Sequence, residues 1–259
     1  MKVFVTGHNG FLGKKIVKVL KEKHEIITSN DLDIESKENV KKNLTDCEIV
    51  IHCAGQANVD WCEQNKLETW KTNVAGTINV VEKCKELNAK LVYVSTDYCV
   101  NPTNFYAYTK LVGEEQALKL PDSLSVRIST LYGFNDENDK KTFVNWVLSS
   151  KDEIKTVTDN ITHPTLIDDI ALNIERQMKK RKGIINVVGK DCISKFEFTN
   201  KIIQVFGLSL KNSGIESKEL KHWVAIRPEK IQLEISEEIK THDTIEGLEI
   251  MRKQMKESD

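Results

Sequence analysis

Three glycines near the start of the chain constrain its fold more than any other feature. They follow a short apolar run from Val3 to Val5 and lie in Gly7-His8-Asn9-Gly10-Phe11-Leu12-Gly13, before a stretch with helical periodicity. Glycine permits a tight turn and lets backbone N–H groups approach a phosphate, and the N-terminus of the next helix adds partial positive charge. The pattern therefore predicts a nucleotide-binding loop. Its predicted binding residues are Gly7, Asn9, Gly10, Phe11, Leu12 and Gly13.

Short apolar runs alternate with longer amphipathic stretches through the first half of the 259-residue chain. Examples are the runs 3–6, 49–53 and 91–95, each of which is followed by a helical pattern. Strands and helices that alternate in this way favour parallel strand pairing, because each crossover places a helix on one face of the sheet. The sequence therefore predicts an α/β fold with a doubly wound parallel sheet of the Rossmann type.

The alternation loosens after about residue 134. We therefore expect a dinucleotide-binding domain over residues 1–155 and a smaller C-terminal substrate-binding lobe over residues 156–259. The apolar run at 184–189 is expected to return as a strand to the sheet of the first domain. Ligands of open α/β sheets bind at the carboxyl ends of the strands, where a second lobe would close a cleft.

Composition excludes several classes of partner. The chain has 38 Lys and Arg against 39 Asp and Glu, whereas a nucleic-acid-binding protein needs a basic patch. No stretch approaches the roughly 20 apolar residues of a spanning helix, so we expect a cytoplasmic protein with no membrane contact. The six cysteines show neither CxxC nor Cys/His metal spacing, so we expect neither a metal nor disulfides.

The end of the second apolar run indicates which dinucleotide is bound. Dinucleotide-binding chains that hold an unmodified adenosine ribose carry an acidic residue there, but this run ends at Ser29 and Asn30. A neutral end tolerates a 2′-phosphate, so we predict NADP as the cofactor, with NAD as the alternative. Ser29, Asn30, Asp33 and Ile34 are expected at the adenosine end, although Asp33 could instead cap the next helix.

A tyrosine and a lysine at i, i+4 spacing suggest the reactive group. Tyr106 and Lys110 would lie on one face of a helix that follows the turn-forming residues 101–104. An ammonium group nearby would lower the pKa of the phenol and make Tyr106 a general acid or base. The preceding apolar run ends in Thr96 and Asp97, which would reach the same edge of the sheet.

These segments together resemble the extended short-chain dehydrogenase/reductase superfamily over nearly the whole chain. The resemblance implies that Cys53, Ala54 and Gly55 lie along the cofactor and that Asn73 supports the strand-end backbone. It also implies that Thr96 hydrogen-bonds the substrate or Tyr106, and that Lys110 holds the nicotinamide ribose. The substrate would be a nucleotide sugar.

Two families within this superfamily compete for the chain. The run from Ser95 to Lys110 is similar to the active-site run of UDP-N-acetylglucosamine 4,6-dehydratases, which carry Lys where this chain has Tyr98. The motifs at 31–34, 159–171 and 227–233 instead resemble dTDP-4-dehydrorhamnose reductases. Because chemistry depends on the site more than on the scaffold, we predict the dehydratase, possible C5 inversion included. The reductase, or an epimerase/reductase, is the alternative.

Each alternative gives the same residues different roles. In the dehydratase, Tyr106 removes the proton of the sugar 4-OH while hydride passes to NADP⁺, and Asp97 protonates the departing 6-OH. Tyr98 or Cys99 is the candidate base at C5. In the reductase, Tyr106 donates a proton to a 4-ketone while NADPH supplies hydride. A third hypothesis is a cofactor-binding regulatory subunit without turnover.

Substrate contacts are expected from the later part of the chain. Arg227 could clamp a diphosphate, His163 could line the sugar-nucleotide cleft, and Ser129 lies in the segment that would lead past the nicotinamide. The long helical patterns at 67–87 and 107–118 suit the helix-pair interface common in the superfamily, so we expect a homodimer.

Overall fold

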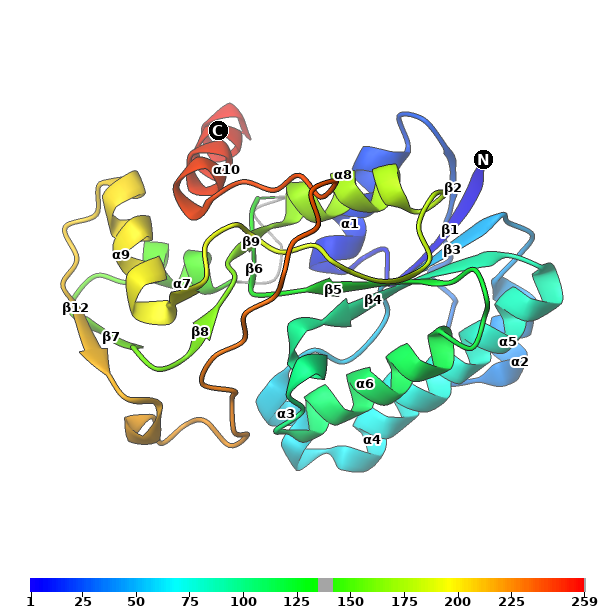
Figure 1. The fold of residues 1–259 in the computed structure, drawn as a ribbon, viewed down its shortest axis with the longest axis horizontal. Helices are drawn as coiled ribbons and strands as arrows, with labels where there is room; N and C mark the ends of the chain where they lie inside the picture. The colour runs from blue at the N-terminus through cyan, green and yellow to red at the C-terminus, as the bar shows by residue number, and fades with distance from the viewer. Residues whose placement is uncertain (135–141, 259) are drawn as a thin grey trace.

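A six-stranded parallel sheet forms the centre of the computed structural model, which describes residues 1–134 and 142–258 (Figure 1). Each strand pairs in parallel with its neighbours. In sheet order the strands are β2 (Glu25–Ile27), β1 (Lys2–Thr6), β3 (Ile49–His52), β4 (Lys90–Thr96), β5 (Leu124–Ile128) and β10 (Gly183–Asn186).

Helices cover both faces of this sheet, which confirms the predicted doubly wound α/β fold (Figure 1). Alternate residues of a strand point to opposite faces, so Val3 and Val5 pack on one side and Phe4 on the other. Burial on both sides explains why the strands read as continuous apolar runs. One face carries α1 (Phe11–Leu20) and α8 (Ile167–Gln177), and the other α2 (Lys37–Asn43), α5 (Thr77–Leu87) and α6 (Phe105–Ala117).

The strand order creates a crevice between β1 and β3. The chain passes from β1 to β2 on one side and then returns to place β3 on the other. The loops that leave β1 and β3 therefore diverge above and below the sheet, which is the arrangement that binds ligands in open α/β folds. Three short helical elements follow β3: α3 (Val59–Gln64), α4 (Lys66–Trp70) and η1 (Lys71–Gly76). A fourth, η2 (Asp97–Val100), follows β4.

A second group of elements lies beside the carboxyl edge of the sheet (Figure 1). Tyr132, Phe198 and Leu248 belong to its apolar cluster. The chain enters this group before residue 155 and leaves it again for α8 and β10, so the division at 155 stays a prediction. Its elements are β6 (Leu131–Tyr132), α7 (Phe143–Ser149), β7 (Ile154–Val157), β8 (Ile161–Thr162), β9 (Thr165–Leu166), β11 (Ile193–Ser194), α9 (Lys195–Phe206), β12 (Asn212–Ile215), η3 (Ser217–Glu219) and α10 (Thr244–Ser258).

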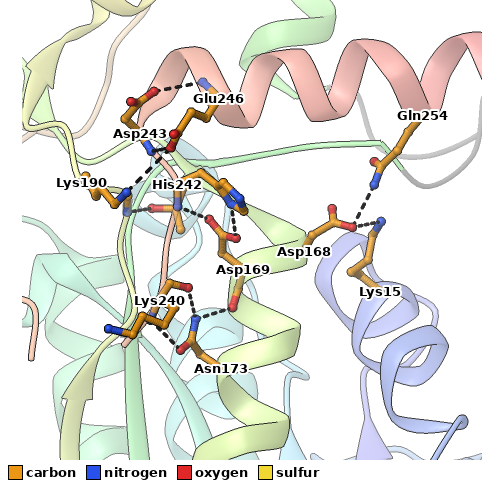
Figure 2. Close-up of polar contacts among 12 residues, drawn as sticks. Lys15, Asp168, Asp169, Asn173, Lys190, Lys240, His242, Asp243, Glu246 and Gln254 are labelled. Carbon is orange, nitrogen blue, oxygen red and sulfur yellow. Dashed lines mark hydrogen bonds and ion pairs between the residues drawn. The ribbon is translucent and has the colours of Figure 1, made fainter. Parts of the chain in front are cut away.

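Polar contacts fasten the C-terminal segment to α8 (Figure 2). The carboxylate of Asp169 accepts hydrogen bonds from the backbone N–H of His242 at 2.9 Å and pairs with its Nδ1 at 2.7 Å. One turn later, Asn173 exchanges two hydrogen bonds with the backbone of Lys240, at 2.8 and 3.1 Å. Asp169 and Asn173 are buried, so these contacts satisfy polar groups that would otherwise be costly.

A third contact reaches the helix that follows the glycine loop. Lys15 of α1 is 3% exposed and its Nζ lies 3.0 Å from Oδ1 of Asp168. The same oxygen accepts a hydrogen bond from Gln254 of α10 at 3.0 Å (Figure 2). The two ends of the chain therefore meet on one carboxylate.

None of the helices in the described ranges combines the length and apolarity needed to cross a membrane. All six cysteines are free thiols. Within the described ranges, no three His, Cys, Asp or Glu side chains gather in a way that could hold a metal ion.

A buried ion pair joins α6 to β5. Glu114 accepts hydrogen bonds from Arg127 Nη2 at 2.6 Å and from Ser125 Oγ at 2.7 Å, and its side chain is 2% exposed. Burial alone would raise the pKa of Glu114, but the hydrogen bonds from Arg127 and Ser125 outweigh it and hold the pKa below its usual range.

We predict that Glu114→Ala lowers the free energy of unfolding at pH 7 by about 3 kcal/mol or more, because it leaves Arg127 unpaired in a mostly buried place. The pair stabilises the fold above the ordinary pKa of glutamate and loses this effect as pH falls through the lowered folded pKa. Urea unfolding at pH 7 and below pH 4 should therefore show the difference from wild type shrinking at acid pH. Glu82→Gln, which breaks the exposed pair with Lys37, should change little, and equal effects of both variants would contradict the prediction.

Candidate active site

The glycine loop lies against the end of β3 at distances that admit no side chain. Gly7 has φ of +65°, and a Cβ there would lie 2.7 Å from the backbone nitrogen of Ala54. A Cβ on Gly13 would lie 2.1 Å from the carbonyl oxygen of Gly7. The loop therefore keeps its backbone open as a cradle for an anionic group at the start of α1.

Two adjoining cavities of about 360 and 450 Å³ run along the carboxyl edge of the sheet and share Gly7, Gly55 and Gln56. Together they are elongated, with the glycine loop in the middle, and this shape fits a dinucleotide. Among the predicted site residues, the first cavity is lined by Gly7, Asn9, Ser29, Asn30, Asp33, Ile34, Ala54 and Gly55. The second is lined by Gly7, Gly10, Phe11, Leu12, Gly13, Cys53, Gly55, Thr96, Asp97, Tyr98, Tyr106, Lys110 and Ser129.

The first cavity ends at the uncharged amide of Asn30, which follows β2. Oδ1 of Asn30 lies 2.9 Å from His8 Nε2 and accepts a hydrogen bond from Asn9 Nδ2 at 3.0 Å, so this amide links β2 to the glycine loop. The carboxylate of Asp33 accepts from the backbone of Glu35 at 2.9 Å, within a turn before α2. Asn30 thus stands where a carboxylate would repel a 2′-phosphate.

The second cavity holds the predicted tyrosine and lysine. Helix α6 begins at an N-cap in which Asn104 Oδ1 accepts from the backbone of Ala107 at 2.9 Å, and this cap fixes where the helix starts. Tyr106 and Lys110 lie one turn apart on the face that lines the cavity. The end of β4 brings Thr96 to the same cavity.

The electrostatics of this pair differ from the sequence-based expectation. Burial raises the pKa of Tyr106 well above its ordinary value, and burial lowers the pKa of Lys110 to about 8. The ammonium of Lys110 donates to the carbonyl of Val94 at 2.8 Å and lies 4.1 Å from the ring centre of Tyr93. The expected lowering of the pKa of Tyr106 by Lys110 was therefore wrong, because desolvation is the larger effect.

Asp97 holds two hydroxyl groups at the edge of the cavity. Its carboxylate accepts hydrogen bonds from Thr96 Oγ1 at 3.0 Å and from Ser129 Oγ at 2.5 Å. Asp97 is 3% exposed, and burial raises its pKa despite these hydrogen bonds. Both carboxylate oxygens are engaged, so Asp97 positions Thr96 and Ser129, and its expected role as an acid stays a prediction.

Tyr98, the base expected at C5, lines the second cavity beside Tyr106. Its ring meets that of Tyr106 edge-on, with the ring centres 6.1 Å apart. Burial raises the pKa of Tyr98 far above its ordinary value, which favours the protonated phenol. This shift opposes the expected role of Tyr98 as a base.

Asn73 acts on the site through the backbone. Its Oδ1 accepts from the backbone N–H of Gln56 at 2.8 Å, and its Nδ2 donates to the carbonyl of the same residue at 3.0 Å. Asn73 is buried and lines neither cavity. It supports the loop after β3, as expected, and the expectation that it binds the cofactor directly was wrong.

His163 is a packing residue, so the expectation that it contacts substrate was wrong. The side chain is 3% exposed. Nδ1 lies 2.8 Å from the carbonyl of Gly189, and Nε2 accepts from the backbone N–H of Leu233 at 3.1 Å. Both ring nitrogens are therefore committed to backbone groups.

Arg227 is held by an acid from the first part of the chain. Its Nη1 and Nη2 donate to the two oxygens of Asp60 at 2.5 and 2.6 Å, and Asp60 also accepts from the backbone of Val224 and Ala225. The hydrogen bond from Arg227 chiefly lowers the pKa of Asp60 to about 2. This ion pair holds the segment before Pro228 against α3.

Sequence reasoning missed three residues of this region. Gln56 lines both cavities, and its place directly after Gly55 could have revealed it. Lys195, at the start of α9, donates to Thr130 at 3.0 Å, and burial lowers its pKa to about 8. Asp60 is 167 positions from Arg227, and no sequence pattern marks that pairing.

Comparison with known proteins supports this geometry. The family model "RmlD substrate binding domain" matches residues 1–249. The crystal structure of dTDP-4-dehydrorhamnose reductase from Bacillus anthracis in complex with NADP is 27% identical, has a TM-score of 0.90, and covers 98% of this chain and 99% of that one. The dTDP-4-dehydrorhamnose reductase of Mycolicibacterium smegmatis is 27% identical over 80% of this chain and 69% of its own length.

The similarity to dehydratases is confined to part of the chain. The inverting UDP-N-acetylglucosamine 4,6-dehydratase of Campylobacter jejuni is 32% identical over 44% of this chain and 41% of its own length. The dTDP-4-dehydrorhamnose reductases reported above match along 80% and 98% of the chain instead. The prediction of a 4,6-dehydratase acting on UDP-N-acetylglucosamine was therefore wrong.

We predict that Gly10→Ala weakens NADP binding about tenfold or more, because the added methyl group would fill the cradle that a phosphate must approach. The change should leave the fold intact, since the new Cβ would lie 3.2 Å from the Gly7 carbonyl oxygen. Gly13→Ala would place its Cβ 2.1 Å from the Gly7 carbonyl oxygen, so it should lower both the affinity for NADP and the midpoint of thermal unfolding. Isothermal titration and thermal unfolding test this, and wild-type affinity in Gly10→Ala would refute it.

Proposed function

The chain belongs to the RmlD substrate binding domain family of the extended short-chain dehydrogenase/reductase superfamily, and on that premise we propose that it is an NADPH-dependent 4-keto-sugar reductase. Its substrate would be a nucleotide diphosphate 4-keto-6-deoxy sugar of the dTDP-4-dehydrorhamnose kind. The confirmed resemblance to the superfamily supports the nucleotide-sugar class. The reductase reading was the alternative expected from the sequence.

The similarity of the chain to dTDP-4-dehydrorhamnose reductases along most of its length is the observation that carries this proposal, and the protonation of Tyr106 agrees with it. A reductase needs a proton donor at the start of turnover, whereas a dehydratase needs a phenolate that can remove a proton from the 4-OH. Burial raises the pKa of Tyr106, so the phenol is protonated at neutral pH. The buried site thus supplies the form that a carbonyl reduction uses.

The proposed reaction divides the work among a few side chains. NADPH, when bound, supplies the hydride that adds to C4 of the sugar. Tyr106 donates its proton to the carbonyl oxygen, which completes the alcohol, and solvent then returns a proton to the phenolate. Thr96, which lies beside Asp97, would turn its hydroxyl proton from Asp97 to the same oxygen and orient the ketone. The ammonium of Lys110 would hold the nicotinamide ribose.

The cofactor expectation, NADP with NAD as the alternative, is confirmed: the relative from Bacillus anthracis was solved with NADP. In this chain the residues that would hold NADP are those that line the two cavities. Asn30 and Ser29 would face the adenosine ribose, and the glycine loop would face the diphosphate. The absence of a carboxylate from the end of β2 supports NADP over NAD.

Substrate contacts are proposed for Ser129 and Arg227. Ser129 lines the cavity at the end that holds Tyr106. Arg227 would bind the substrate diphosphate directly if it gave up its ion pair with Asp60. If it kept that pair, it would hold the segment before Pro228 over the diphosphate. Both roles place a nucleotide sugar between the carboxyl edge of the sheet and the second group of elements. We also propose that the enzyme is cytoplasmic.

A homodimer is also part of the proposal. Leu67 and Trp70 on α4 and Tyr108 on α6 are large apolar side chains that are 61%, 38% and 48% exposed. The rings of Trp70 and Tyr108 stack with centres 6.4 Å apart, so these two partly exposed side chains form one apolar patch. Figure 1 shows α4 and α6 near each other. An apolar surface of this kind favours an interface between copies.

For the reaction we predict that the purified protein oxidises NADPH when given dTDP-4-dehydrorhamnose, the 4-keto-6-deoxy sugar. Tyr106→Phe should lower kcat by about 10²-fold or more, the scale of a lost general acid, while the Kd for NADPH stays unchanged. UDP-N-acetylglucosamine without reduced cofactor should lose no water, as judged by mass spectrometry. NADPH binding without turnover of the keto sugar would instead identify a regulatory subunit.

For the interface we predict that Trp70→Glu shifts the protein from dimer to monomer, because it places a charge in an apolar contact. Light scattering after size-exclusion chromatography measures the mass. The matched control is Trp146→Glu on α7, a tryptophan that is 41% exposed elsewhere. A wild-type protein that is monomeric at micromolar concentration would refute the dimer.

A further inference from the structure

A third cavity, of about 1110 Å³, lies at the opposite edge of the main sheet, where β4, β5 and β10 begin. The ends of α5, α6 and α8 surround it. In Figure 1 this edge is on the right, on the side away from the second group of elements. Neither the dinucleotide cavities nor the proposed reaction uses it.

Basic side chains dominate the lining of this cavity. Lys85, Lys90, Lys119 and the run 179–182 contribute seven cations, against three acids. Two of the acids are already engaged: Glu82 pairs with Lys37 at 2.7 Å, and Glu48 accepts from the backbone nitrogen of Lys2 at 2.8 Å. One of the cations, Arg181, is paired with Glu238 at 3.0 Å. The remaining cations of the lining still outnumber its acids.

Helix termini explain only part of this charge. Lysines near the C-terminus of a helix complement its dipole, and this accounts for Lys85, Lys119 and Lys179. It does not account for Lys90 and Lys182, which lie at or just before the start of a strand. Each helix end brings about half a negative charge, so three of them offset less than the cationic excess.

Two further observations indicate that the cavity is built to hold a ligand. Ser123 lines it and is 2% exposed, yet its hydroxyl has no hydrogen-bond partner within the described ranges. A buried hydroxyl without a partner is costly, and a bound acceptor would satisfy it. Burial, with Lys182 as a like-charged neighbour, lowers the pKa of Lys90 even though Asp122 opposes the shift, and an anion would relieve that repulsion.

We propose that this cavity is a second ligand site, which binds a group carrying two or more phosphates. Ammonium groups are compact point charges that suit phosphate oxygens, and several of them around one cavity match a polyanion better than a single carboxylate. The Ser123 hydroxyl, which is buried beneath the lining, would rotate towards the cavity to donate to one of the oxygens. The phosphates could belong to a free polyphosphate or nucleotide, or to the headgroup of an anionic lipid. This proposal does not depend on the reductase activity.

The test titrates tripolyphosphate into the full-length protein by calorimetry, with NADP present at saturation so that the dinucleotide site is filled. Lys180→Glu/Lys182→Glu should weaken the affinity about tenfold or more, because it turns two attractive contacts repulsive. The matched control is Lys253→Glu/Lys256→Glu, with the same change in net charge on α10. Ser123→Ala should also weaken binding without lowering the thermal midpoint, because its hydroxyl has no partner to lose.

A parallel experiment identifies the source of the phosphates. Sedimentation with vesicles of cardiolipin, which carries two phosphates, and with phosphatidylcholine as the neutral reference, is run on the same variants. Tripolyphosphate binding that only the cavity variants weaken supports a free phosphate ligand, and sedimentation with cardiolipin that only they weaken supports a lipid headgroup. No binding in either experiment, or equal losses in the cavity and control variants, overturns the proposal.

Discussion

The close approach of the glycine loop to the end of β3 is the constraint on which the rest of the site depends. Because Gly7 and Ala54 are nearly in contact, the crevice between β1 and β3 is narrow at its base and open above. Asn73 then fixes the loop after β3 through Gln56. The chain thus uses buried backbone contacts to shape the base of the space for a dinucleotide, and the start of helix α1 adds partial positive charge there.

Sequence patterns predicted the parts of the site that are local. The glycine spacing, the i, i+4 pair of Tyr106 and Lys110, and the neutral group after β2 each depend on neighbours in the chain, so periodicity and strand order are enough to place them. The doubly wound sheet followed from the same alternation. The structure placed these residues along two cavities that meet at the glycine loop.

Properties that depend on burial could not be read in the same way. The pKa of Tyr106 was expected to fall because Lys110 is one turn away, but the depth of both side chains reverses the outcome. His163 was expected to line the substrate cleft, but both of its ring nitrogens contact backbone groups. The dehydratase expectation failed for a related reason, since it weighed one catalytic run above the motifs spread along the chain.

The shared carboxylate of Asp168 has a consequence for how the protein is made. Lys15, next to the cofactor loop, needs that carboxylate as its partner, and the carboxylate is completed by Gln254 near the last residue. A ribosome delivers the N-terminal strand and helix first, yet their buried lysine has its full surroundings only after the final helix has emerged. The nucleotide-binding half therefore matures late, because its first helix is fully secured only after Gln254 has left the ribosome.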